Sequence, residues 1–345
     1  MEIKTFLSDL CGLMSVVGFE YRDEEKLTAL VAPYFDGHDY DRVGNHIFFR
    51  RCGKENAKRL LIDVHYDEVG LLVKNITEDG HLCVCNQGGL DPHVLPASEV
   101  VVYGNEVLPG IILTVPRDLK TDAQKKGLTP VSELLVDVGL TKSEAEALTP
   151  IGSPVGYTPV YTELENDNFC GKGFDDKCLI VPVVAAVASL NMDELDCDIY
   201  VSLSAREEVG QHAVSAAAFG IRPDAAIVFD VEFGNLHGAK DPSETVVGGG
   251  MTLTYSAILD RDFTDFIMET AEELGFDCQP VVEAVATGTH ADELVFAAGG
   301  IPTVLLGVPI CHMHTANELL SLDDLRETAK LLGTVIRKRY ERKDV

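Results

Sequence analysis

Histidine and acidic side chains stand immediately beside several short apolar runs of this sequence. The residues that share this placement are His65, Asp67, Asp175, Asp176, Glu207, Glu208, Asp230 and His314. Imidazoles and carboxylates are ligands that suit zinc, cobalt or manganese, and nothing in the pattern indicates a thiolate site. Adjacent carboxylates at the end of an apolar run, such as Glu207 and Glu208, repel each other and resist burial unless a cation offsets them.

The apolar runs beside these residues have the length of buried strands. They cover residues 59–64, 197–203, 224–229 and 301–308, and helical patterns alternate with them at 23–34, 179–190, 211–219, 262–274 and 321–338. Strands that alternate with helices predict an α/β fold, with a mostly parallel sheet covered by helices on both faces. Because open α/β sheets bind ligands at the carboxyl ends of their strands, we expect the side chains above to gather there.

One segment departs from this alternation. Residues 69–85, VGLLVKNI-TEDG-HLCVC, are typical of a hairpin with an Asp-Gly turn, and residues 99–115 continue with β-branched side chains around Gly and Pro. Thr141 and Glu144 have the spacing of a capping box that opens one short helix. We therefore predict a β-rich domain over residues 69–165, inserted into a domain made of residues 1–68 and 166–345. With no ligand candidates of its own, the insert is expected to serve oligomerisation or gating.

Each candidate ligand has an ordinary explanation when it is taken alone. Asp175 and Asp176 could cap the helix that follows them, Asp230 could be a turn residue, and a single histidine after a strand is commonly a loop residue. Five coincidences at equivalent ends of one sheet favour a ligand site. Two divalent ions about 3.5–4 Å apart need a bridging carboxylate and about two further ligands each, which two histidines and three carboxylates provide. A carboxylate left uncoordinated beside them could act as a general base.

The charge balance of the chain narrows its partners. Lysine and arginine total 28 against 56 acidic residues, which gives a net charge of −28. Nucleic acid and anionic membranes both bind through cationic patches, so neither is an expected partner. Nine cysteines without zinc-finger spacing indicate a reducing cytoplasm rather than a disulfide framework, and the first residues lack the pattern of a signal peptide.

Five motifs follow one another along the chain. They are His65-x-Asp67-Glu68-Val69-Gly70, Lys172-Gly173-Phe174-Asp175-Asp176-Lys177, Glu207-Glu208-Val209-Gly210, Asp230-Val231 and Met313-His314-Thr315. This succession resembles the dinuclear metallo-aminopeptidases, and among them the glutamyl and tetrahedral aminopeptidase family, whose members are sometimes labelled endoglucanases. The resemblance spans nearly the whole chain. It implies a zinc exopeptidase-like fold and a metal-dependent aminopeptidase that acts on short peptides.

The resemblance also implies a set of metal ligands and the cofactors they hold. His65 and Asp230 would hold one divalent ion, Glu208 and His314 would hold the other, and Asp175 would bridge the two. The chain would thus bind two divalent metal ions per subunit, with zinc or cobalt expected ahead of manganese. The expected particle is a cytoplasmic homo-oligomer, such as a dodecamer.

Two further residues receive roles from the same resemblance. Asp67 would hydrogen-bond the far nitrogen of His65 and fix the orientation of that ring. Glu207 would take a proton from a water between the metals and pass it to the leaving amine. His290 and Cys311-His312 stand where the family commonly has Asp and Arg-Tyr, and both are expected near the substrate.

Other functions stay open on the residues alone. A deacylase could use the same two metals on N-acyl amino acids or small amides. A glycoside hydrolase usually needs two carboxylates without a metal, and cellulose sites generally offer aromatic platforms, whereas this chain has no Trp and 7% aromatic residues. A non-enzymatic assembly subunit would lack a ligand or the base, and this sequence lacks neither.

Overall fold

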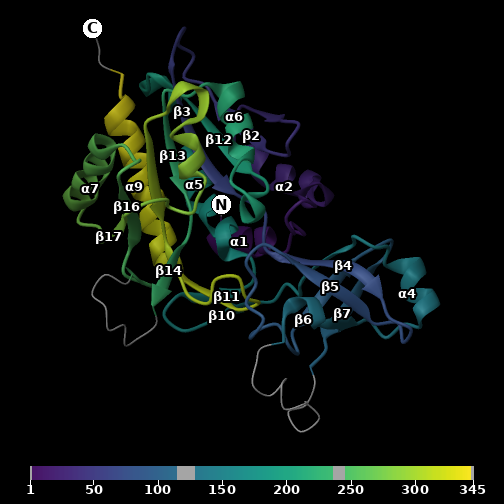
Figure 1. Ribbon diagram of the computed structural model, residues 1–345. Helices are drawn as coiled ribbons and strands as arrows, with labels where there is room; N and C mark the ends of the chain where they lie inside the picture. Colours follow the sequence, from purple (N-terminus) through teal and green to yellow (C-terminus); the bar gives the residue numbers. More distant parts are fainter. Residues whose placement is uncertain (1, 115–128, 236–244, 343–345) are drawn as a thin grey trace.

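An eight-stranded sheet forms the centre of the computed structural model, which describes residues 2–114, 129–235 and 245–342 (Figure 1). In spatial order its strands are β1 (Gly37–Tyr40), β2 (His46–Arg50), β12 (Cys197–Ser204), β3 (Lys58–His65), β13 (Ala225–Phe229), β18 (Thr303–Gly307), β16 (Met251–Ser256) and β17 (Cys278–Glu283). The pairs within β12-β3-β13-β18 are parallel, and so is the β16–β17 pair. The remaining pairs are antiparallel. The predicted α/β fold with a mostly parallel sheet is confirmed.

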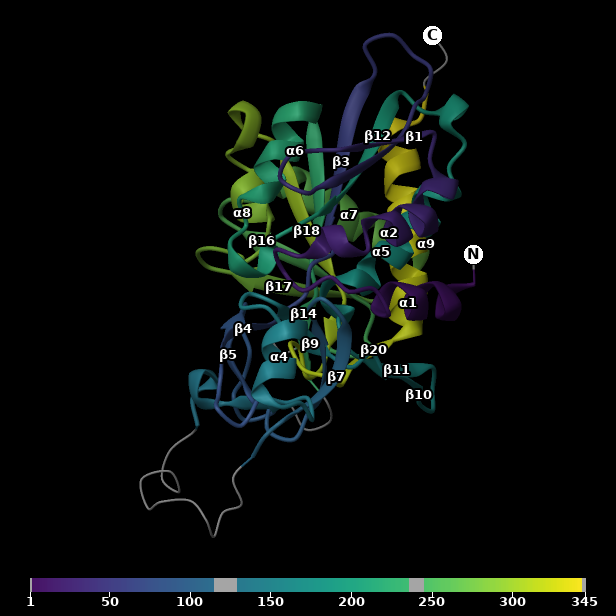
Figure 2. The same ribbon diagram turned by 90° about the vertical axis from the view of Figure 1, so that its right-hand side faces the viewer.

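Helices cover both faces of this sheet. Successive residues of a strand point to opposite sides, and the central strands are apolar on both sides, so each face needs a covering layer. Leu60 and Ile62 of β3 belong to a large core with α1 (Ile3–Cys11), α2 (Glu24–Val31), α5 (Phe174–Ala188), α7 (Arg261–Leu274) and α9 (Leu322–Tyr340). Leu61 packs on the other face with α6 (Ala213–Ile221) and α8 (Ala291–Leu294). Figure 2 shows the two layers, with α6 and α8 on one side of β3 and α1 and α9 on the other.

A closed barrel lies beside the central sheet (Figures 1 and 2). Around the barrel its strands are β4 (Gly70–Ile76), β5 (Leu82–Gln87), β8 (Leu135–Asp137), β7 (Val107–Ile112), β6 (Glu99–Tyr103) and β9 (Pro154–Tyr157), and they enclose a separate apolar core. The predicted hairpin is the antiparallel β4–β5 pair. The predicted capping box opens α4 (Lys142–Leu148), where Thr141 and Glu144 bond each other's main-chain groups. Part of the segment 69–165, residues 115–128, lies outside the described residues.

Two short sheets lie near the ends of the central strands. One contains β10 (Tyr161–Glu163), β11 (Asn168–Gly171) and β20 (Glu318–Ser321), and the other contains β15 (Thr245–Val246), β14 (Glu232–Asn235) and β19 (Pro309–Ile310). In the first sheet Gly171 pairs with Glu318, so the residue that opens β20 sits beside the start of α5. None of the described helices is both long and apolar enough to cross a membrane.

Some boundaries differ from those predicted from the sequence. The helix expected over 179–190 begins at Phe174 and ends at Ala188, and the helix expected over 211–219 begins at Ala213. The strands β16 and β17 were not expected at all. Because β17 is the edge of the sheet, its side chains are either half-buried or exposed and form no apolar run.

Candidate metal centre

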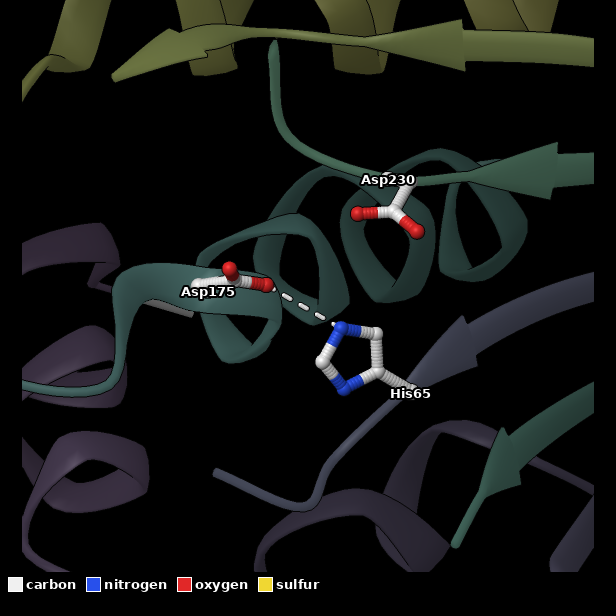
Figure 3. Close-up of side chains that lie close together, drawn as sticks. All are labelled: His65, Asp175 and Asp230. Atoms are coloured by element: carbon white, nitrogen blue, oxygen red, sulfur yellow. Dashed lines mark hydrogen bonds and ion pairs between the residues drawn. The ribbon is translucent and has the colours of Figure 1, made fainter. Parts of the chain in front are cut away.

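Two overlapping groups of potential metal ligands lie at the carboxyl ends of the central strands. One group is His65, Asp175 and Asp230, and the other is Asp175, Glu208 and His314. In each group every residue offers one ligand atom, and these atoms all lie within 4.8 Å of one another. Figure 3 shows the three side chains of the first group converging from separate elements. Asp175 is therefore common to both groups.

The two carboxylate oxygens of Asp175 face different histidines. Its Oδ1 lies 3.0 Å from Nε2 of His65, and its Oδ2 lies 3.1 Å from Nε2 of His314. Nε2 of His314 is also 3.3 Å from Oε1 of Glu208. A carboxylate between two sets of ligands, with one oxygen toward each, is the arrangement that a bridging ligand requires.

The ligands come from the ends of different elements. His65 is the last residue of β3, Asp230 follows β13 directly, and Glu208 lies just beyond β12. His314 lies in the loop between β19 and β20, and Asp175 stands in the first turn of α5, where its backbone angles (φ −70°, ψ 107°) are not helical. The candidate ligands thus meet beyond the carboxyl ends of the strands, as the α/β pattern predicts.

A tight turn allows two adjacent glutamates to face the same site. The strand β12 ends at Ser204, Arg206 adopts a positive φ of 64°, and Glu207–Val209 form a 3-10 turn. Gly210 follows with a φ of 144°, a conformation that favours glycine. In an extended strand the two glutamate side chains would point to opposite faces. The turn removes that alternation, and both Glu207 and Glu208 line one cavity.

Asp67 contacts both this turn and the far nitrogen of His65. Its Oδ1 accepts a hydrogen bond from the main-chain N–H of Glu207 (3.0 Å), and its Oδ2 accepts one from Glu208 (3.1 Å). Nδ1 of His65 lies 3.1 Å from the main-chain carbonyl oxygen of Asp67 and 3.7 Å from its carboxylate. A carbonyl fixes the same tautomer that a carboxylate would, with Nε2 free to bind a metal.

His314 is oriented in the same way by a residue of the barrel segment. Its Nδ1 is 2.7 Å from the main-chain carbonyl oxygen of Gly89, which leaves Nε2 directed at Asp175 and Glu208. A carbonyl accepts only, so Nδ1 of His314 carries the proton. The segment that was expected to hold no ligands therefore contributes one orienting contact.

Glu318 is a site residue that the sequence did not reveal. Its buried carboxylate accepts hydrogen bonds from the main-chain N–H groups of Phe174 (2.6 Å), Asp175 (3.3 Å) and His314 (2.7 Å). It thus ties together the two loops that carry Asp175 and His314. The only sequence signal is an acidic residue at the start of the apolar stretch Leu319-Leu320, which is equally typical of an exposed strand end.

The remaining sequence candidates lie behind or beside the site. Asp176 is fully buried, and neither of its carboxylate oxygens has a hydrogen-bond partner among the described residues. His290 is also buried, and its Nδ1 lies 2.7 Å from Oδ2 of Asp63. Cys311 is buried and its Sγ approaches the carbonyl of Gly234. Neither His290 nor Cys311 lines the cavity, although the rings of His290 and His65 lie 6.4 Å apart between centroids. That His290 and Cys311-His312 lie near the substrate stays a prediction.

Burial and mutual repulsion shape the protonation of the acidic ligands. Burial raises the pKa of Glu208 to about 7 and the pKa of Glu207 above its ordinary value. Desolvation raises the pKa of Asp230 well above its ordinary range, and the negative charge of nearby Glu207 raises it further. Burial also acts on Asp175, but hydrogen bonds from His314 and His65 outweigh it and hold the pKa of Asp175 low.

This electrostatic pattern fits a cation. Within the described part of the chain, Asp175, Glu208 and Asp230 form no ion pair with a lysine or arginine, so the protein itself supplies no fixed positive charge to them. Hydrogen bonds to Asp175 and Glu208 outweigh the effect of burial and raise the pKa of His314 to about 11, which shows how strongly the site attracts positive charge. Histidine nitrogens and carboxylate oxygens are ligands that divalent zinc, cobalt and manganese accept.

The site opens into a cavity of about 620 Å³. It is lined by Glu207 and by all five candidate ligands, His65, Asp175, Glu208, Asp230 and His314. Glu207 belongs to neither ligand group, so its carboxylate is available beside them. A cavity of this size holds a small substrate rather than a folded protein surface.

A parallel-rich sheet that gathers histidines and carboxylates at its carboxyl edge is the arrangement expected of a metal-dependent hydrolase. The family profile described as M42 glutamyl aminopeptidase matches residues 44–331. The chain therefore belongs to the M42 glutamyl aminopeptidase family and is a hydrolase that acts on peptide bonds. Membership in this metallopeptidase family implies divalent metal ions, in agreement with the two ligand groups.

Individual relatives support the same assignment. A lysyl aminopeptidase of Pyrococcus furiosus is 28% identical over 300 residues, which cover 86% of this chain and 85% of the relative. The crystal structure of a TET aminopeptidase from a marine sediment Thaumarchaeota archaeon has a TM-score of 0.89 and 25% identity, covering 100% of this chain and 97% of that one. The TET1 peptidase of Pyrococcus horikoshii, which can assemble into a tetrahedron or a large octahedral shell, has a TM-score of 0.84 and 26% identity, with 97% and 99% covered.

Proposed function

We propose that this protein is an aminopeptidase that removes N-terminal residues from short peptides with two divalent metal ions and a glutamate base. The observation that carries the proposal is Asp175, whose two oxygens face separate histidines and which belongs to both ligand groups. His65 and Asp230 would hold one ion, and Glu208 and His314 the other. Zinc or cobalt suit these ligands best, with manganese third.

Glu207 is the general base of this proposal. Its side chain lines the same cavity and stands outside both ligand groups, and burial raises its pKa, which favours a carboxylate that can both accept and return a proton. Bound divalent ions would polarise the scissile carbonyl and lower the pKa of a water molecule in the site. Glu207 would accept the proton of the attacking water and deliver it to the leaving amine. Asp67 acts as a positioning residue, because it fixes the turn that carries Glu207.

A panel of substrates and metals tests this function. The protein is freed of metal by chelation, then supplied with zinc, cobalt or manganese and assayed on Leu-, Lys- and Glu-p-nitroanilides, with N-acetyl amino acids in parallel. We expect hydrolysis of the anilides only after metal is restored, with two ions per chain in the active form by elemental analysis. Full activity in rigorously metal-free protein would exclude the mechanism. Hydrolysis of N-acetyl amino acids without hydrolysis of anilides would establish a deacylase instead.

We further propose that the chain forms a homo-oligomer, such as a dodecamer, and that the segment 69–165 serves its assembly or gating. The related TET1 peptidase assembles into closed shells. In this chain the barrel exposes apolar side chains, including Val107 (64% exposed) and Ile151 (62% exposed), which a partner subunit could cover. The barrel also has its own apolar core.

Light scattering tests the assembly. We expect a large particle for the intact chain and a smaller one when residues 70–164 are replaced by a short linker. An intact chain that is monomeric at micromolar concentration would contradict this part of the proposal without affecting the peptidase function. The cytoplasmic location inferred from the cysteines stays a prediction.

A further inference from the structure

The wall of the cavity away from the metal ligands carries two more acidic side chains. Glu232 opens β14 two residues after Asp230, and Glu283 closes β17 at the edge of the central sheet. Both line the cavity of about 620 Å³ that contains the ligand groups. Neither belongs to those groups, so the proposed metal site leaves both carboxylates unassigned.

Strand pairing places Glu283 on the face that looks into the cavity. Thr252 and Thr254 of β16 line the cavity, and residues two apart on a strand share a face. Ser256, two residues further, is the register partner of Glu283 in the parallel β16–β17 pair. Paired residues point to the same side of a sheet. Glu283 therefore projects beside the threonines rather than into the layer of α7.

Glu232 is held at the same wall by its neighbours. The strand β14 pairs with β19, where Glu232 is opposite Pro309, and the main-chain N–H of Phe233 donates a hydrogen bond of 2.9 Å to Oε1 of Glu232. The second oxygen is free of that contact. Glu232 and Glu283 are close enough for the charge of one to act on the other.

The charge of the cavity stays negative on this wall after the proposed metals bind. Among the described residues that line it, six are acidic and none is lysine or arginine. Two divalent ions would add four positive charges beside the four carboxylates Asp175, Glu207, Glu208 and Asp230. Glu232 and Glu283 would then remain uncompensated, because neither is paired with a lysine or arginine among the described residues.

Apolar side chains line the cavity beside these carboxylates. Val231, Phe233 and Met313 contribute to it, and Phe233 is 73% exposed. Lysine and arginine combine an apolar stem with a cationic head, so each can pack its stem on such a surface while its charge meets a carboxylate. A glutamate side chain would bring a like charge to the same wall, and a leucine side chain would leave the carboxylates without a partner.

We propose that Glu232 and Glu283 select peptides whose N-terminal residue is lysine or arginine. This specificity rests on the aminopeptidase function proposed above. The two carboxylates bind the side-chain cation of the substrate, while the ligand groups and Glu207 carry the cleavage.

Matched anilides test the preference. With the zinc- or cobalt-loaded protein, kcat/KM is measured for Lys-, Arg-, Leu- and Glu-p-nitroanilide at low and high salt. We expect kcat/KM for the Lys and Arg anilides to exceed that for the Leu anilide by about 10-fold or more, with the Glu anilide the poorest substrate, because the half-buried carboxylates attract a cation and repel an anion. Added salt should narrow the gap, because the selecting charges are partly exposed to solvent.

Variants test the two residues. Glu232→Gln and Glu283→Gln should each lower the Lys-to-Leu ratio of kcat/KM about 5-fold, and the double variant should lower it further. Glu283→Arg should raise kcat/KM for Glu-p-nitroanilide relative to kcat/KM for Lys-p-nitroanilide. A variant that had merely lost its structure would not show this reversal. Glu272→Gln, on the exposed face of α7, removes the same charge outside the cavity and should leave the ratio unchanged.

The outcomes separate this inference from the function beneath it. If no anilide is hydrolysed with any metal, the aminopeptidase function fails and the specificity fails with it. If anilides are hydrolysed but Leu or Glu is preferred, the specificity alone is wrong. The specificity is also wrong if the glutamine variants lower kcat/KM for the Lys and Leu anilides equally. The carboxylates would then bind the α-ammonium group that all these substrates share.

Discussion

The main-chain N–H of Glu207 donates a hydrogen bond of 3.0 Å to Oδ1 of Asp67, a residue 140 positions earlier in the chain. The other oxygen of the same carboxylate accepts from Glu208 at 3.1 Å. Asp67 follows β3 and the glutamates follow β12, which are parallel neighbours in the sheet. One buried carboxylate therefore joins two strand ends and sets the direction of both the proposed base and a proposed ligand.

Asp67→Asn should weaken the site without unfolding the protein. An asparagine keeps one acceptor oxygen but turns an NH₂ group toward one of the two main-chain donors, so the turn loses a hydrogen bond. We expect kcat/KM to fall about 10- to 100-fold, the range found when partners of metal ligands are removed. Circular dichroism and anilide kinetics measure the two effects. Asp79→Asn, in the exposed β4–β5 turn, is the matched control, and equal activity in both variants would contradict the role of Asp67.

The two glutamates of the turn should fail differently when each is changed. Glu207→Gln should keep both metals and lose kcat by about 10²-fold or more, the usual contribution of a general base. Glu208→Gln should first lose one metal, with activity falling as a consequence. Elemental analysis beside kinetics distinguishes them. Turnover near that of the wild type in Glu207→Gln would exclude it as the base.

The sequence predicted which side chains lie together here because the candidate ligands stand at the ends of the strongest apolar patterns in the chain. His65 ends β3, Asp230 follows β13 and Glu208 lies just beyond β12, and the burial of these three strands matches the apolar runs. Parallel pairing then brings the strand ends together by topology alone. The same reasoning could not find β17, whose residues form a half-exposed edge.

Residues that act through main-chain contacts could not be predicted from sequence patterns. Glu318 accepts from the N–H groups of Phe174 and His314, which lie 144 and 4 positions away, and only folding brings the more distant one to it. The contact from His314 to the carbonyl of Gly89 is of the same kind, since any residue type supplies a carbonyl. The hydrogen bonds that the carboxylate of Asp67 accepts from the main-chain N–H groups of Glu207 and Glu208 could likewise not be predicted from residue types.

Glu318→Gln should loosen the loops that carry Asp175 and His314. The carboxylate is 2% exposed and accepts three main-chain hydrogen bonds, whereas a glutamine amide can accept with only one of its two terminal atoms. We expect a loss of about 1–3 kcal/mol in the free energy of unfolding, the cost of an unsatisfied buried group. Metal affinity should fall with it. Urea denaturation and metal titration measure both, with Glu269→Gln on the exposed face of α7 as the control.

Removal of metal should lower the thermal stability of the protein. Without cations, the carboxylates of Asp175, Glu208 and Asp230 crowd one another within two small groups. An ion that binds the folded state alone stabilises it in proportion to the logarithm of its concentration, by about 2.7 kcal/mol at 100 times its dissociation constant. We expect Tm to fall on chelation and to rise again with added zinc or cobalt. An unchanged Tm across the titration would contradict the site.

His46 should make the stability of this protein depend on pH at a place remote from the metal ligands. Its ring is 1% exposed and stacks on His38 with centroids 5.1 Å apart, and its Nε2 has no hydrogen-bond partner among the described residues. Burial, with a smaller effect of His38, lowers the pKa of His46 to about 4. The ring is therefore neutral in the folded protein, whereas in the unfolded chain it binds a proton near pH 6.5.

The unfolded state thus binds more protons than the folded state between the two pKa values. Stability from this group is complete above about pH 6.5 and is lost as the pH falls toward 4. From pH 7 to pH 5 the expected loss is about 2 kcal/mol in the free energy of unfolding. His46→Phe keeps a flat ring among its aromatic neighbours but does not titrate. Urea unfolding at both pH values measures the difference, and an equal pH dependence in the wild type and His46→Phe would show that His46 is not its source.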